Sequence, residues 1–163
     1  MKTLFDEAGN HYELKNKDKR APVRGSVSFY LKPACNKKIK DEHGVEWQIS
    51  LIDLSVQLTS KQMQVFLRLC LHTDSYGVIY GGMSKISDSL GIHSRDQLSR
   101  IKSALFAAKA IIQSQTGNIM INPFISLPYG KDGFYAQQIW KKINYDNDAY
   151  FEGIVDTCSA LGW

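Results

Sequence analysis

The chain has 163 residues, of which 44% are hydrophobic and 11% aromatic, and its formal net charge is +4. This length fits one compact domain with an arm or a terminal extension, and the hydrophobic content can build a core, which excludes a wholly disordered chain. No apolar run approaches the ~18–20 residues of a membrane span, and residues 1–10 lack the apolar core of a signal peptide. We therefore expect a cytoplasmic protein with no membrane partner.

The positive charges are unevenly distributed along the chain. Residues 15–40 contain nine lysines and arginines against the single acid Asp18, and residues 95–131 contain five against Asp96 alone. Residues 132–163 reverse the balance, with two lysines against five acids. Segregated bases favour a polyanionic partner on one side of the molecule, although a solvated, loop-rich surface has the same composition.

The N-terminal part is predicted to contain an arm and a β element. Residues 1–24 are polar and aperiodic, which indicates a flexible basic arm. Residues 25–33 and residues 45–54 both alternate apolar and polar side chains, as strands do. We expect them to pair as an N-terminal β-hairpin across a basic turn, on which Lys37 and Lys38 are candidate phosphate contacts.

The middle of the chain carries five successive element signals. Apolar residues at helical spacing predict helices that begin after a threonine or serine cap, and alternation around a Thr-Gly-Asn turn predicts a hairpin. The predicted elements are a helix at 61–74 capped by Thr59 or Ser60, a short strand at 78–80, a short helix at 83–91, a helix at 95–108 and a hairpin at 110–123. This order is typical of a winged helix-turn-helix, so we expect an α+β DNA-binding domain over residues 25–130.

The helix at 95–108 has the pattern of a recognition helix. Ser94 and Gln97 match the S-x-x-Q capping box, which fixes where the helix begins. The face toward the core carries Leu98, Ile101, Leu105 and Ala108. Small residues on the opposite face let the helix approach the major groove, where arginine pairs bidentately with guanine. The candidate DNA-binding residues of this helix and its cap are Ser94, Arg95, Ser99, Arg100, Lys102 and Ser103.

Two interpretations of this outward face remain open. An ordinary solvated helix also carries small polar residues with a few charges, and Arg100 can pair with Asp96 one turn earlier. DNA contact is favoured when the preceding helix and the following hairpin are considered together. The candidate phosphate contacts on the preceding helix are Ser84 and Lys85.

The hairpin at 110–123 gives a weaker signal. Its tip holds no lysine or arginine, although an inserted basic side chain is the usual way to exploit a narrow minor groove. Thr116 and Asn118 are its candidate DNA contacts, through hydrogen bonds to phosphates. The alternative is that the hairpin only completes the fold.

The sequence GNIMINPFIS at residues 117–126 resembles the end of the wing in the RepL family of plasmid replication proteins and related winged-helix replication initiators. The similarity covers roughly residues 55–125, and its most particular part is Gly117-x-Ile119-x-Ile121 followed by Asn122-Pro123. The resemblance implies a sequence-specific DNA-binding protein, encoded by a plasmid or phage, that acts at a replication origin. Winged-helix repressors of the MarR type share the layout without that function.

Residues 131–163 are predicted to form a C-terminal helical extension. Apolar residues recur at helical spacing in two stretches, and Asp146 or Asp148 can cap the second helix. This much apolar surface must be buried, either against the domain itself or against a second copy, which would make a homodimer.

The sequence shows no motif for catalysis or for metal binding. Cys35, Cys70 and Cys158 are widely spaced, and the histidines never stand in ligand spacing, which predicts a reducing compartment and no zinc site. The glycine turns lack the G-x-x-x-x-G-K-[ST] spacing of a phosphate loop. We expect no enzymatic activity and no cofactor.

Three classes of function fit these observations. The first is a replication initiator, which would bind and deform double-stranded DNA at an origin and recruit host replication proteins. The second is a transcriptional regulator on the same scaffold, and the third is a protein-interaction adaptor that touches no DNA. We prefer the initiator because of the Ile-Asn-Pro ending of the wing, with the regulator as the alternative.

Overall fold

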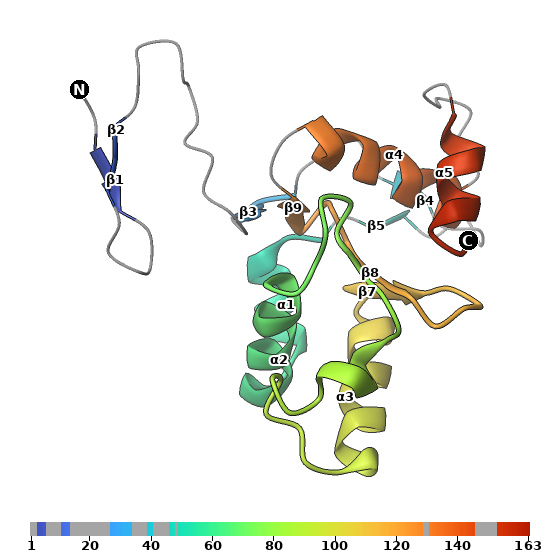
Figure 1. The fold of residues 1–163 in the computed structure, drawn as a ribbon. Coiled ribbons are helices and arrows are strands. Elements are labelled where there is room, and N and C mark those ends of the chain that lie inside the picture. The colour runs from blue at the N-terminus through green and yellow to red at the C-terminus, as the bar shows by residue number, and fades with distance from the viewer. Residues whose placement is uncertain are drawn as a thin grey trace.

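The computed structural model describes residues 3–5, 11–13, 27–33, 39–40, 46–47, 49–128, 131–145 and 153–163, which form an α+β fold of helices and small antiparallel sheets (Figure 1). The helices are α1 (Leu51–Gln57), α2 (Ser60–Cys70), the 3-10 helix η1 (Met83–Ile86), α3 (Arg95–Ala107), α4 (Lys131–Tyr145) and α5 (Ile154–Ala160). The strands are β1 (Thr3–Phe5), β2 (His11–Glu13), β3 (Val27–Phe29), β4 (Ile39–Lys40), β5 (Glu46–Trp47), β6 (Val78–Ile79), β7 (Ile111–Gln113), β8 (Ile119–Ile121) and β9 (Ser126–Pro128).

A three-stranded sheet separates the helices into two groups. Its order is β6-β8-β7, and all neighbours are antiparallel. Ile111 pairs with Ile121 in the β7–β8 hairpin, which confirms the hairpin predicted at 110–123. Figure 1 shows α1 and α2 on one flank, α3 facing them, and α4 and α5 beyond the sheet.

The helices α1 and α2 both begin at a capping box. The Thr59 hydroxyl accepts the Gln62 N–H, and the Gln62 side chain accepts the Thr59 N–H in return. These bonds satisfy N–H groups that a helix start leaves without a partner. The helix predicted at 61–74 is therefore confirmed with Thr59 as its cap, although it ends at Cys70.

The predicted hairpin between residues 25–33 and 45–54 is wrong. Residues 27–29 do form strand β3, but its partner is β9, where Phe29 pairs with Ser126. Within the second predicted strand, residues 46–47 form the short strand β5, but its partner is β4. A capping box of Ser50 and Asp53 then starts α1 at residue 51, so the rest of that predicted strand is helical. Local hydrogen bonds at this cap outweigh the alternation of apolar residues that suggested a strand. Lys37 and Lys38 lie outside the described residues.

Two apolar clusters fill the interior on opposite faces of the sheet. The larger one joins α1, α2 and α3, and includes Leu54, Phe66 and Leu105. The smaller one lies under α4 and α5 and is centred on Trp140. Strand β8 contributes to both, because alternate side chains of a strand point to opposite faces: Ile119 and Ile121 enter the larger cluster, and Met120 enters the smaller one.

The C-terminal helices bury their apolar faces on this same chain. Among the described residues, the buried hydrophobic side chains of α4, α5 and the turn after α5 are Ala136, Ile139, Trp140, Ile154, Cys158 and Leu161. Helix α5 begins after Gly153, which has a φ of 82° and makes no side-chain cap bond. The predicted cap by Asp146 or Asp148 is therefore wrong, and both residues lie outside the described ranges. Among the helices described, none is both long and apolar enough to cross a membrane.

Asn122 fixes the point where the sheet, α3 and β9 meet. Its side chain is fully buried, donates to the Lys109 carbonyl at 2.9 Å and accepts the Phe124 N–H at 2.9 Å. Its own N–H donates to the Ala110 carbonyl at 2.9 Å. Lys109 has a φ of 56°, so the chain makes a sharp left-handed turn at the end of α3. Asn122 holds this turn in place by bonding on either side of it.

We predict that Asn122→Ala lowers the free energy of unfolding by at least about 2 kcal/mol, because the buried Phe124 N–H and the partly buried Lys109 carbonyl lose their partners. Urea unfolding followed by circular dichroism measures this. The control is Gln115→Ala on the exposed hairpin turn, which should change stability by no more than about 0.5 kcal/mol. Equal unfolding midpoints for the two variants would contradict the role of Asn122.

Candidate nucleic-acid interface

Helix α3 starts where the sequence predicts. The Ser94 hydroxyl accepts the Gln97 N–H at 3.2 Å, as expected of the cap. The Gln97 side chain accepts the His93 N–H at 3.3 Å rather than that of Ser94, so the reciprocal bond of the predicted capping box lies one residue earlier. Both bonds fix the path of the chain into α3.

The two faces of α3 separate as the periodicity predicts. Ile101, Leu105 and Ala108 are buried, and Leu98 packs against the same cluster. The opposite side is solvent-exposed, and its members are Arg95, Asp96, Ser99, Arg100, Ser103 and Ala107. The exposed face therefore carries small side chains along its centre and the bases Arg95 and Arg100 beside them, and the small side chains allow close approach of another surface.

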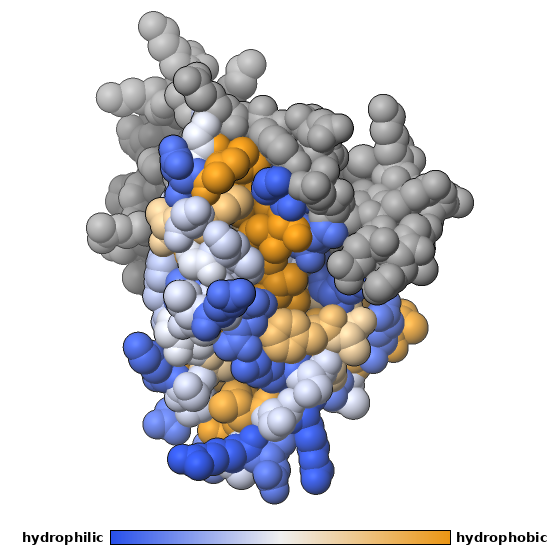
Figure 2. Space-filling model, turned by 90° about the vertical axis from the view of Figure 1, so that its right-hand side faces the viewer, coloured by the Kyte–Doolittle hydropathy of each residue, from blue (hydrophilic) through white to orange (hydrophobic). Residues whose placement is uncertain are grey.

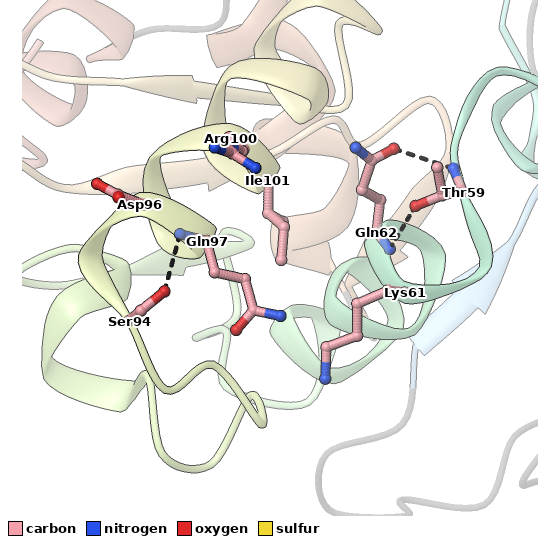
Figure 3. Close-up of a pocket in the computed structure, with 8 residues that line it drawn as sticks. All are labelled: Thr59, Lys61, Gln62, Ser94, Asp96, Gln97, Arg100 and Ile101. Atoms are coloured by element: carbon pink, nitrogen blue, oxygen red, sulfur yellow. Dashed lines mark hydrogen bonds between the residues drawn. The ribbon is translucent and has the colours of Figure 1, made fainter.

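A groove of about 470 Å³ lies between the start of α2 and the first turns of α3 (Figure 3). Its lining residues are Thr59, Lys61, Gln62, Ser94, Asp96, Gln97, Arg100 and Ile101. Arg100 lies on its α3 wall, and among the described residues no carboxylate lies within 4.0 Å of its guanidinium, Asp96 included. The suggested ion pair between Asp96 and Arg100 does not form, so Arg100 is left available to a partner.

The flanking bases occupy different settings. Lys102 is half-buried, and its amine lies 5.9 Å from the centre of the Phe106 ring one turn later. This is a cation–π contact within the helix. Lys85 and Ser84 are exposed on η1, which covers only the first part of the short helix predicted at 83–91. The Lys85 side chain lies over Gly81.

The hairpin turn is held by the protein itself. The Asn118 side chain accepts the Gly81 N–H at 3.1 Å and donates to the Leu161 carbonyl at 3.0 Å. The Thr116 hydroxyl lies 2.8 Å from that of Ser114. A side chain at Gly162 would collide with Thr116, so the end of α5 packs directly on the turn. Asn118 therefore has a structural role that its sequence position did not reveal.

The distribution of polar surface agrees with this arrangement. Figure 2 shows the face toward which the β7–β8 hairpin extends. Hydrophilic side chains gather at its lower end, at the level where α3 begins in Figure 1, and the largest continuous apolar area lies higher, with smaller apolar patches below it. The most polar part of this face is therefore at the level of the first turns of α3.

The buried thiols do not form a reactive site. Burial raises the pKa of Cys70 to about 12, and burial also raises the pKa of Cys158. A thiol that holds its proton at neutral pH is a poor nucleophile and a poor metal ligand. Among the described residues, no three His, Cys, Asp or Glu side chains are grouped so that they could hold a metal ion.

Two basic residues of α2 lie near the start of α3, and the sequence analysis did not predict them as site residues. Lys61 lines the groove, and Arg68 lies on the same face two turns later. Both reach the turn at Gly91 that leads into α3. Their spacing of seven residues was visible, but which face of α2 meets that turn depends on packing.

We predict that Ser94→Ala destabilises the protein by about 1 kcal/mol, because the Gln97 N–H loses its partner at the helix start. Ser103→Ala is the matched control on the exposed face of α3, and it should be neutral or slightly stabilising because alanine favours helices. Thermal unfolding by circular dichroism compares them. If both variants unfold at the parent temperature, the cap contributes nothing.

Comparison of the chain with protein-family models, with curated proteins and with solved structures found no match.

Proposed function

We propose that this chain is a winged helix-turn-helix protein that binds double-stranded DNA by placing α3 in the major groove. The order α2, β6, η1, α3, β7, β8 and the sheet order β6-β8-β7 support this assignment. In such a fold α3 follows a tight turn and is the recognition helix, while the β7–β8 hairpin is the wing.

The observation that carries the proposal is the exposed face of α3. Its centre consists of Ser99, Ser103 and Ala107, and Arg95 and Arg100 stand beside it. The major groove is about 12 Å wide and admits a helix whose side chains on that face are small. Arginine without an internal ion pair can donate two hydrogen bonds to guanine, so Arg100 is the best candidate for base recognition.

The other candidate residues take supporting roles in this proposal. Ser94 and Arg95 lie at the start of α3, where N–H groups and the helix dipole favour a phosphate. Ser84 and Lys85 face solvent on η1 and would contact the phosphate backbone of the DNA. Lys102 lies on α3 beside its exposed face and would also contact phosphates. Because Asn118 is already bonded on both amide atoms, we propose that the wing completes the fold rather than reading DNA.

Within DNA binding, we propose the role of a replication initiator that acts without catalysis. Its support is the resemblance of residues 117–126 to the wing of RepL-type proteins. Asn122 is the distinctive residue of that stretch, and its buried bonds give it a structural role here.

The role is tested by selecting bound fragments from the whole DNA of a host strain and its mobile elements. We expect several repeated copies of one short site beside an A·T-rich stretch, because an initiator without catalytic motifs must bind and deform DNA that melts easily. A single inverted repeat over a promoter, with plasmid maintenance unchanged when the protein is deleted, would favour a transcriptional regulator instead. Failure to bind any duplex at low salt would contradict DNA binding altogether.

On the selected site, Arg100→Ala should weaken binding by about 1–3 kcal/mol and relax the preference for one base pair, because a bidentate contact carries discrimination. Fluorescence anisotropy with the selected duplex and single-base variants measures both effects. The control is Lys141→Ala on α4, whose amine lies 5.6 Å from the centre of the Phe124 ring. An Arg100 variant that binds every duplex like the parent would show that α3 is an ordinary surface helix.

A further inference from the structure

Two cationic side chains of α2 converge on the turn that leads into α3. The Lys61 amine donates to the Gly91 carbonyl at 2.8 Å. A Cβ at Gly91 would lie 2.7 Å from an Arg68 guanidinium nitrogen and 3.3 Å from the Lys61 amine. Both charged groups therefore lie beside the same backbone position, which is a glycine with a φ of 70°.

This pair has no acidic partner within the described residues. No carboxylate lies within 4.0 Å of either the Lys61 amine or the Arg68 guanidinium. Two like charges repel each other, and a nearby acid is the usual compensation in a folded chain. The Lys61 amine has three N–H donors and uses one on Gly91, so donors remain for an anion. The Arg68 guanidinium is exposed and adds its own planar set of donors.

The position of Lys61 and Arg68 relative to α3 indicates which anion they would bind. Lys61 shares the groove in Figure 3 with Arg100, and the Arg68 guanidinium lies near Gly91 at the turn before α3, so both bases lie on the α2 side of that helix. Lys85 lies over Gly81, and Gly81 is bonded to the hairpin turn through Asn118, so this base stands on the wing side. A helix in the major groove has a phosphate backbone along each side, and contacts to these backbones fix its register.

We infer that Lys61 and Arg68 form a phosphodiester-binding site that anchors one DNA strand beside α3. The inference rests on the proposed function and adds residues that the sequence did not single out. Lys61 could instead serve only to hold the Gly91 carbonyl. That role needs only the Lys61 amine. It does not explain why the Arg68 guanidinium, which has no acidic partner, lies beside the same residue.

The test measures the salt dependence of duplex binding by the full chain and by the double variant Lys61→Gln/Arg68→Gln. Each lost phosphate contact should reduce the slope of log K against log [salt] by about 0.9. We expect a reduction of roughly 1–2 in the slope, equal weakening on the selected and on a random duplex, and an unchanged ratio between them. The conservative exchange Lys61→Arg/Arg68→Lys should keep the slope of the parent.

Two controls separate this inference from the proposed function and from misfolding. Lys141→Gln on α4 removes a distant charge and should leave the slope unchanged. Arg68→Gln alone preserves the bond from Lys61 to Gly91, so its slope should fall without a change in melting temperature. If the parent binds duplex DNA and the variants keep its slope, or lose base preference instead, the phosphate site is refuted while DNA binding stands. If the parent binds no duplex, the proposed function fails first.

Discussion

The arrangement of this domain depends on how the chain leaves α3 and enters the sheet. At that point Lys109 turns left-handed, and the buried Asn122 bonds to its carbonyl and to the backbone on both sides. The same asparagine stands between Ile121, which packs in the larger cluster, and Phe124, which packs in the smaller one. A buried amide that lost these partners would cost more than the bonds contribute, so the junction has one favourable geometry. The orientation of α3 relative to the sheet follows from it.

Local signals in the sequence were sufficient for the parts that concern α3. The Ser94 cap, the buried arc through Ile101 and Leu105, and the hairpin turn all depend on residues within a few positions of one another. Such features are governed by propensity, capping and turn chemistry, which a single sequence displays. The exposed face of α3 could be predicted for the same reason.

The parts that failed depend on contacts between distant residues. Strand β3 pairs with β9, which lies almost a hundred positions later, and nothing near residue 29 indicates that partner. The capping box at Ser50 was a local signal for α1, but the alternation across residues 45–51 concealed it. The two bases of α2 near Gly91 and the bonds of Asn118 to Gly81 and to the end of α5 likewise exist only after packing. Sequence analysis therefore predicted the exposed face of α3 and missed the residues that surround it.

The burial of β8 on both faces has a consequence for how the hairpin finds its alignment. In most hairpins a slip by one residue would expose apolar side chains, and that penalty selects the correct pairing. Ile119, Met120 and Ile121 are all buried, so a slipped strand would still present an apolar side chain to each cluster. Hydrophobicity alone cannot discriminate between the two alignments. Discrimination falls to the polar groups at the ends of the strand, Asn118 and Asn122, whose hydrogen bonds can form in one alignment only. The hydrogen bonds of these two asparagines therefore favour the observed pairing register of β7 and β8 over a register shifted by one residue.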